Sequence, residues 1–440
     1  MPDMNAGLGT IYRKQMRQLK DTVKNSYGGV YVLELLAWRR AVRELGAGAQ
    51  KAGSPARLVF VPCDPYSLDG SRGDQAMLRG TVDGLRAQLG AVEVGAITAT
   101  PEAVVRAGAL SFTALPVWNH PFSYDEAFAA IRAFGATHLA VIGADVIDGY
   151  YSAKASARML LLAEGARRMG LKVTTLGFSF NEHPSPAMKP IFREVGGTLV
   201  LNARDVVSAE RLTAFSGRQP TLVADVAFLM KPADGNSATA DAERWIDARR
   251  AAGRPVFGAN LHPHLLKNPK PGELETLARS MASAILAAYR ETPSSWLLLP
   301  HDVRPGVRDS ICLDIIAQTL RPVLSDDLYY PEGDLSAPEL KRLVSLTDAV
   351  TTGRMHLAIA ALGSGVPVLA ITYQGKFPGL LRHFELGGDL MMSPAEAADP
   401  AIFTVRLKSF LAGIDGIRPK IAARLEGVGH LARRNLQPLI

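Results

Sequence analysis

The stretch AVTTGRMHLAIAALGSGVPVLAITYQGK, from Ala349 to Lys376, decides the fold of this chain. A short β-like run ends at Thr352-Gly353, an apolar helix covers 357–362, and two glycines and a proline close that helix. A second apolar run over 366–371 predicts another strand. Strand, helix, glycine stop and strand make one turn of a parallel wind, so the stretch predicts an α/β protein.

Polar side chains follow the ends of both predicted strands. Arg354 and His356 come directly after the first strand, and Tyr373 and Lys376 come after the second. Parallel sheets bind ligands at the carboxyl ends of their strands, and a helix N-terminus favours an anion. The stretch therefore predicts a cationic site that also handles protons.

Size and composition indicate a globular protein of two domains. The chain has 440 residues, 48% of them hydrophobic and 21% charged. Two distant cysteines, Cys63 and Cys312, are expected to be reduced core residues. We see no signal peptide and no run of about 20 apolar residues, so we expect a cytoplasmic protein.

The net charge of +7 is concentrated at residues 1–50 and 416–440. These basic ends either attract the inner face of the cytoplasmic membrane and a lipid-linked substrate, or are solvated helix surfaces. Nucleic acid is not expected, because basic residues are not interleaved with aromatic ones. The chain lacks the glycine-rich phosphate loop of kinases of the GxxxxGK[ST] type.

Strands and helices alternate through both halves, which predicts two Rossmann-like domains facing across a cleft. The polar segment KPADGNSA, 231–238, predicts the boundary. We expect an N-terminal domain over 1–235 on the acceptor side, a C-terminal domain over 250–415, and an amphipathic helix over 416–440.

Further candidate site residues lie at other predicted strand ends. Gly73 and Asp74 open the helix after the first strand, where Asp74 either caps that helix or contacts a ligand. Asp145 and Asp148 follow a strand over 139–143 and have three open interpretations: a base and its partner, contacts to sugar hydroxyls, or caps of the next helix.

Arg204 ends a later strand and is a candidate for binding an anion, whereas its neighbours Asp205 and Ser208 either share that site or only cap a helix. His301 and Asp302 follow another strand end, and we expect them to face the cleft.

Several of these motifs resemble the polysaccharide pyruvyltransferase family. Its signature is matched by Gly-Arg-Met-His at 353–356, Gly-Val-Pro at 365–367, Tyr373 and Lys376, although the family usually has serine where Gly353 stands. Weaker matches are GDQAML at 73–78, RDVVS at 204–208 and DVAF at 225–228.

The resemblance implies a GT-B-like fold and transfer of a pyruvyl group from phosphoenolpyruvate to a sugar. The product would be a ketal on a bacterial exopolysaccharide or on its lipid-linked repeat unit, with no cofactor and no metal. Ketal formation needs an acid/base, for which we expect His356, while Arg354 and Lys376 would hold the phosphate or carboxylate. Two structural readings stay open: His356 as a helix cap, and Arg354 as the partner of a carboxylate between the domains.

Three alternatives stay open at this point. A GT-B glycosyltransferase using a nucleotide sugar has the same fold plan, and an Arg/Lys pair also suits a diphosphate. A polysaccharide-assembly scaffold could keep the fold without activity. The His-Pro-His sequence at 262–264 has the spacing of a metal-ligand pair, but no matching carboxylate or cysteine cluster accompanies it.

Overall fold

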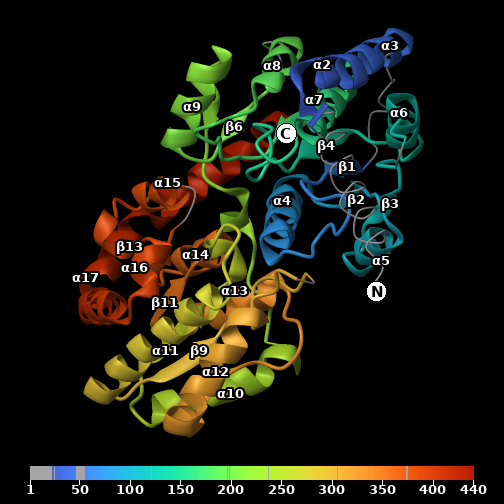
Figure 1. Ribbon diagram of the computed structural model, residues 1–440. Helices are drawn as coiled ribbons and strands as arrows, with labels where there is room; N and C mark the ends of the chain where they lie inside the picture. Colours follow the sequence, from blue (N-terminus) through green and yellow to red (C-terminus); the bar gives the residue numbers. More distant parts are fainter. Residues whose placement is uncertain are drawn as a thin grey trace, which may run out of the picture. The chain divides into compact units, whose positions relative to one another are not determined.

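The computed structural model describes residues 22–23, 25–45, 55–119, 121–195, 197, 199–235, 237–304, 306–372 and 375–440. The chain forms two compact α/β units (Figure 1). Unit 1 comprises the described parts of 1–66 and 91–222 with residues 436–440, and unit 2 comprises the described parts of 67–90 and 223–435. The prediction of an α/β fold with two Rossmann-like domains is confirmed.

The sheet of unit 1 has five parallel strands in the order β3-β2-β1-β4-β5. Its central strand reads Leu-Val-Phe-Val at 58–61, and all four side chains are buried, as parallel sheets covered on both faces require. A separate pair of strands, β6 and β7, is also parallel. The strands are β1 (Ala56–Val61), β2 (Val92–Ile97), β3 (Thr113–Leu115), β4 (His138–Val141), β5 (Lys172–Thr175), β6 (Asn202–Ala203) and β7 (Thr221–Leu222).

Among the described residues of unit 1, one segment consists of α-helical, π-helical and 3₁₀ turns that follow one another. The helical elements are α2 (Tyr27–Val30), η1 (Tyr31–Leu36), α3 (Ala37–Ala41), η2 (Val42–Glu44), α5 (Pro101–Ala109), α6 (Tyr124–Ala133), α7 (Ala153–Arg168), η3 (Pro186–Met188), α8 (Lys189–Glu194) and α9 (Val206–Ser216).

The sheet of unit 2 has six parallel strands in the order β10-β9-β8-β11-β12-β13. Numbered from β8, this is the 3-2-1-4-5-6 order of a Rossmann sheet, whose strand order reverses between β8 and β11. The strands are β8 (Val256–Asn260), β9 (Ser295–Leu298), β10 (Leu328–Tyr329), β11 (Ala349–Thr352), β12 (Val368–Ile371) and β13 (Met391–Met392).

The helices of unit 2 form two groups. Helix α11 packs against α12 and α17, whereas α13 packs against α14 and α4. The helical elements are α4 (Arg72–Leu89), η4 (Val226–Leu229), α10 (Ser237–Ala251), η5 (Pro263–Leu265), α11 (Glu273–Glu291), α12 (Ser310–Leu324), η6 (Ser325–Asp327), α13 (Ala337–Ser345), α14 (Met355–Leu362), α15 (Phe377–Arg382), η7 (Gly388–Leu390), α16 (Pro394–Ala398) and α17 (Pro400–Arg433). The chain ends with η8 (Arg434–Leu439).

The stretch from Ala349 to Lys376 folds as its sequence predicts. Strand β11, helix α14 and strand β12 follow one another, and Gly363 is the C-cap of α14. The side chains of α14 are buried from Leu357 to Leu362, because apolar residues occupy all six of these positions.

The two units divide the chain differently from the predicted domains. Residues 67–90, which carry α4, belong to unit 2 although they follow the first strand of unit 1. The second unit begins at Val223 rather than after the polar segment at 231–238. The helix expected over 416–440 is the second half of α17 followed by η8, and only residues 436–440 belong to unit 1. The polar segment at 231–238 therefore does not mark the boundary between the two units.

Within the described part of the chain, no helix has both the length and the apolarity needed to cross a bilayer.

Candidate functional site

The candidate site lies in unit 2, at the carboxyl ends of β8, β9 and β11. The strand order reverses between β8 and β11, which is where open α/β sheets bind ligands. Asn260 ends β8 and Thr352 ends β11. Their side chains meet, since the Thr352 hydroxyl donates to the Asn260 amide oxygen at 3.0 Å. This contact fixes the two loops that carry the rest of the site.

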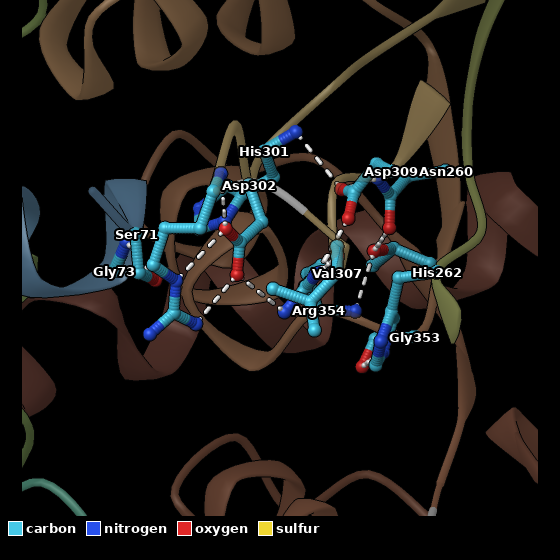
Figure 2. Close-up of polar contacts among 12 residues, drawn as sticks. Ser71, Gly73, Asn260, His262, His301, Asp302, Val307, Asp309, Gly353 and Arg354 are labelled. Atoms are coloured by element: carbon cyan, nitrogen blue, oxygen red, sulfur yellow. Dashed lines mark hydrogen bonds and ion pairs between the residues drawn. The ribbon is translucent and has the colours of Figure 1, made fainter. Parts of the chain in front are cut away.

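Arg354 is held at the centre of the site by two buried carboxylates (Figure 2). Its Nε lies 3.0 Å from Oδ1 of Asp309, and its Nη1 lies 3.2 Å from Oδ2 of Asp302. The Arg354 side chain is 10% exposed, and both carboxylates are fully covered. Arg354 therefore has carboxylate partners, as one of the two sequence interpretations supposed, but both partners belong to its own unit.

Asp309 connects the site to the strand ends. Its second oxygen accepts hydrogen bonds from the Asn260 side chain at 2.7 Å and from the main chain of His301 at 2.9 Å. Burial raises the pKa of Asp309, although Arg354 and these two donors favour its charged form. The arrangement keeps the Arg354 guanidinium in one position.

Asp302 is the second carboxylate and binds two arginines. Burial acts to raise its pKa, but the hydrogen bonds from Arg304 and the charges of Arg354 and Arg304 outweigh that effect, so the pKa of Asp302 lies below its usual value. Arg304 donates to Asp302 from Nε at 3.0 Å and from Nη2 at 2.7 Å. The Arg304 side chain is 30% exposed and is thus the more accessible of the two guanidinium groups.

The first turn of α4 is attached to the loop after β9. Ser71 and Asp302 form an antiparallel bridge, and the main-chain N–H of Arg72 donates to the carbonyl of His301 at 3.1 Å. Ser71 is the N-cap of α4 and accepts from the N–H of Gly73 at 3.3 Å. Of the two interpretations of Asp74, the helix cap is wrong: Asp74 lies in the first turn and Ser71 is the cap, whereas contact of Asp74 with a ligand stays a prediction.

His356 lies in the first turn of α14, between α4 and the residue before η4. Its Nε2 is 3.5 Å from Oδ2 of Asp225. On the other side of the ring, a Cβ placed on Gly73 would come within 2.3 Å of Nδ1. Only glycine allows α4 to approach the imidazole this closely. His356 is therefore oriented by a carboxylate and by a helix N-terminus, and the N-cap of α14 is Arg354.

Three further histidines lie around the arginines. Burial lowers the pKa of His301 and His262 well below the usual value, and the charge of Arg354 lowers both further. The charges of His356 and Arg72 also act on His301, which places these groups around one ring. His301 Nδ1 is buried and has no hydrogen-bond partner among the described residues. His301 and His262 are thus neutral at physiological pH.

His264 lies near a second group of cations. Burial lowers its pKa first, followed by Arg354, while Asp302 opposes the shift and Arg304 and Lys376 add to it. Lys376 therefore lies within electrostatic reach of His264, as both arginines do. Among the described residues, no group of three or more His, Cys, Asp or Glu side chains could hold a metal ion.

The structure brings most of the site residues predicted for the C-terminal domain together with Gly73, which was predicted for the N-terminal domain. Gly73, His301, Asp302, Arg354 and His356 form one site in unit 2, with Lys376 close to it. Tyr373 lies outside the described residues.

Three other predicted site residues belong to unit 1, where they bond to its own loops. Arg204 is buried and its Nε donates to the Ser179 hydroxyl at 2.8 Å. The oxygens of Asp148 accept main-chain N–H groups of Tyr150 at 2.8 Å and Asn181 at 2.7 Å. Asp145 accepts from the Tyr151 hydroxyl at 3.1 Å.

The residues beside Arg204 cap a helix, as one of the two interpretations supposed. Asp205 is the N-cap of α9 and accepts from the Ser208 N–H at 2.8 Å, and the Ser208 hydroxyl also donates to it.

Four residues of the site were not predicted as site residues. Asp225 belongs to the DVAF motif at 225–228, but no role was predicted for it. Asn260, Arg304 and Asp309 belong to none of the motifs. Each lies at or just after a strand end, or just before a helix: Asn260 ends β8, Arg304 follows β9, and Asp309 precedes α12. Position after a strand was the available signal, but it does not tell which polar side chain turns inward.

Solved structures of other proteins show the same type of fold. The UDP-GlcNAc 2-epimerase from Neisseria meningitidis matches with a TM-score of 0.54 at 10% identity, covering 87% of this chain and 99% of that one. A UDP-glucosyltransferase from Polygonum tinctorium matches with a TM-score of 0.54 at 11% identity, covering 88% and 98%. A glycosyltransferase from Rickettsia africae matches with a TM-score of 0.51 at 10% identity, covering 87% and 97%. At these identities the likeness shows the fold alone, which is GT-B-like.

Comparison of the sequence identifies the family, which comparison of the fold does not. Residues 72–375 match the family model described as polysaccharide pyruvyl transferase, and this range is most of the chain. The chain therefore belongs to the polysaccharide pyruvyl transferase family and is a transferase. No curated protein sequence matches it.

Proposed function

We propose that the protein transfers the pyruvyl group of phosphoenolpyruvate to two hydroxyls of a sugar in a bacterial exopolysaccharide or its lipid-linked repeat unit, forming a ketal. The observation that carries the proposal is the Asp225–His356 pair beside a group of arginines at the carboxyl ends of the unit 2 strands. Membership of the family supports the reaction class. The identity of the donor and the roles of the individual residues are our inference.

The donor's phosphate and carboxylate need cations, and we assign this task to Arg304 and Lys376. Both lie near His264 together with Arg354, and Arg304 is partly exposed. A guanidinium offers a planar fork for two oxygens, and an ammonium offers a point charge. Arg354 then positions Asp302 and Asp309 and adds its charge to the same region. Direct contact between Arg354 and the donor stays a prediction.

The chemistry needs one group that gives and takes protons, and we assign His356 to it. A proton from the imidazolium goes to the enol methylene, which becomes a methyl group, and C2 is then attacked by the first hydroxyl, whose proton returns to the imidazole. The bond from C2 to the phosphate oxygen breaks with its electron pair on phosphate. The second hydroxyl bonds to C2 and its proton leaves with the phosphate. Asp225 stabilises the imidazolium at each stage.

The acceptor sugar has a candidate pocket in unit 1. A cavity of about 490 Å³ lies at the carboxyl ends of β1, β2 and β3 and is lined by Asp64, Asn119, Ser152 and Lys154. The ring of Tyr66 also lines it and is largely exposed. A carboxylate, an amide and a hydroxyl beside an aromatic ring are groups that bind sugar hydroxyls and the apolar face of a sugar ring. We assign the acceptor to this cavity rather than to Asp145 and Asp148.

We further propose that the enzyme uses no cofactor and no metal, and that it works in the cytoplasm beside the inner face of the membrane, where a lipid-linked acceptor would lie. Nucleic acid is not among its proposed partners.

Thermal-shift titrations of the full chain with phosphoenolpyruvate, UDP-sugars and GDP-sugars test the donor. Phosphoenolpyruvate should raise Tm, because a ligand that binds only the folded state stabilises it by mass action. The shift should be lost in Arg304→Ala and Lys376→Ala and kept in Lys408→Ala, whose lysine pairs with Glu291 at the surface. A shift with a nucleotide sugar alone would make the protein a glycosyltransferase, and no shift with any donor would favour a scaffold.

A further inference from the structure

The helical segment over residues 22–44 of unit 1 carries apolar side chains on both of its faces. Its inner face includes Val30, Leu35 and Trp38, which are buried in the core of unit 1. Its outer face carries five large apolar side chains, each between 43% and 57% exposed. They are Val23, Tyr27, Val32, Leu33 and Leu36.

These five residues, which we call the apolar stripe, fall within one stretch of 14 residues. Val32 and Leu36 are four residues apart in η1 (Tyr31–Leu36), a spacing that places both on one side of a helix, and Leu33 is next to Val32. Elsewhere in the described chain, exposed large apolar residues occur singly or in pairs, such as Val104 and Val105. A concentration of five exposed large apolar side chains within 14 residues is the kind of feature that marks an interaction site.

The margin of this stripe is basic. Arg40 and Arg43 follow it and are exposed. Helix α8 lies beside α3, because Arg39 pairs with Glu194 at 2.6 Å, and α8 adds two more exposed cations, Lys189 and Arg193. In the segment itself Glu34 is buried and Glu44 is the only exposed acid among the described residues.

We propose that the outer face of residues 22–44 binds the surface of a membrane rich in anionic lipids. A helix with an apolar stripe and a basic margin lies in the interface, with apolar side chains at the acyl boundary and cations on the headgroups. Each Lys or Arg near such a surface contributes about 1 kcal/mol. A second copy of the chain fits less well, since a symmetric contact would bring the same cations together.

The sequence before the stripe has the same sign of charge. Arg13, Lys14, Arg17 and Lys20 precede it, and they lie outside the described residues. The inference rests on the proposed function in one respect only: membrane binding would bring the enzyme to a lipid-linked acceptor. Vesicle binding is measured without donor or acceptor, so its failure is distinguishable from failure of the proposed reaction.

Co-sedimentation of the full chain with vesicles tests the proposal. The protein should sediment with vesicles of phosphatidylcholine and phosphatidylglycerol, sediment far less with phosphatidylcholine alone, and be released by salt. Val32→Glu with Leu36→Glu should weaken binding by at least about tenfold, because apolar insertion is lost. The matched control is Val405→Glu on α17, which is 67% exposed and should bind like the parent.

Two further measurements keep the test decisive. Arg40→Glu with Arg43→Glu leaves the apolar stripe intact and should weaken binding to the anionic vesicles. Circular dichroism shows whether each variant is folded. Absence of binding by the parent, or unchanged binding by both double variants, would overturn the proposal. So would a dimer that dissociates in Val32→Glu with Leu36→Glu while no vesicle binds, because the stripe would then be a self-association surface.

Discussion

The carboxyl ends of the two parallel sheets differ in chemistry although their strand orders correspond. In unit 2 these strand ends carry Arg354 buried between Asp302 and Asp309, and His356 follows β11 and lies beside Asp225. In unit 1 the corresponding ends line an open cavity with polar groups and an exposed tyrosine ring. Strand order thus indicates where on a sheet a ligand binds, whereas the residues of the loops determine which ligand it is. We assign the reacting donor to unit 2 and the sugar to unit 1.

The largest effect is expected from His356→Ala, which removes the acid/base assigned to unit 2. Phosphate release from phosphoenolpyruvate in the presence of an acceptor should drop by about 10²–10⁴-fold, while the thermal shift with phosphoenolpyruvate remains. His183→Ala, an exposed histidine in unit 1, is the control and should keep full activity. Near-normal turnover of His356→Ala would end the assignment.

Asp309→Ala tests whether unit 2 depends on its buried charges. Removing this carboxylate leaves Arg354 buried with Asp302 as its remaining partner, so the free energy of unfolding should decrease by about 3–5 kcal/mol in urea titration. Glu275→Ala removes an exposed pair with Arg279 and should cost less than about 1 kcal/mol. Equal costs for the two variants would show that the buried pair contributes no more than a surface pair.

A buried lysine in unit 2 gives a pH dependence. Lys341 donates to the carbonyls of Phe228 and Met230, and burial lowers its pKa to about 8. Between that value and the ordinary lysine pKa of about 10.4, the unfolded chain holds a proton that the folded chain has released, so the free energy of unfolding should increase with pH.

The measurement is the pH series of urea unfolding for the parent and for Lys341→Met. The difference in stability between the two should change by up to about 3 kcal/mol across pH 8–10.5 in favour of the parent. A constant difference would mean that the lysine keeps its ordinary pKa in the folded protein.

Gly353→Ser introduces the residue that the family usually has at this position. A Cβ at 353 would meet the His262 ring at 2.9 Å and Leu265 at 2.9 Å, so these side chains would have to move. We expect a loss of about 1–3 kcal/mol in the free energy of unfolding. Gly413→Ser on α17, where a Cβ would meet nothing within 4 Å, should cause no loss. A Gly353→Ser protein as stable as the parent would show that His262 yields freely.

The smallest effect tests the division between the units directly. Asn119→Ala in the unit 1 cavity should raise the KM for the acceptor by about tenfold through loss of one hydrogen bond, with the Kd for phosphoenolpyruvate unchanged. Arg304→Ala in unit 2 should do the reverse. If Asn119→Ala weakens donor binding instead, the cavity does not belong to the acceptor.

The strongest predictions came from local patterns. The glycine-bounded helix and two strands of Ala349–Lys376 are α14, β11 and β12, because apolar periodicity and glycine stops act over a few residues. The sequence also placed Arg354 and His356 just after the end of β11, and their role at a ligand site stays a prediction. The membership of α4 in unit 2 was missed, because nothing in its sequence tells which sheet a helix packs against.

The sequence by itself determined the α/β class, the order of its elements and the residues that follow each strand. Only the tertiary structure decided which of these residues meet. Asp225, Gly73 and His356 are far apart in sequence, and so are Asn260, Asp309 and Arg354, yet each group converges at one place. The physical reason is that the partner of a buried charge is set by how strands and loops pack in space, whereas helix and strand formation depend mainly on neighbouring residues.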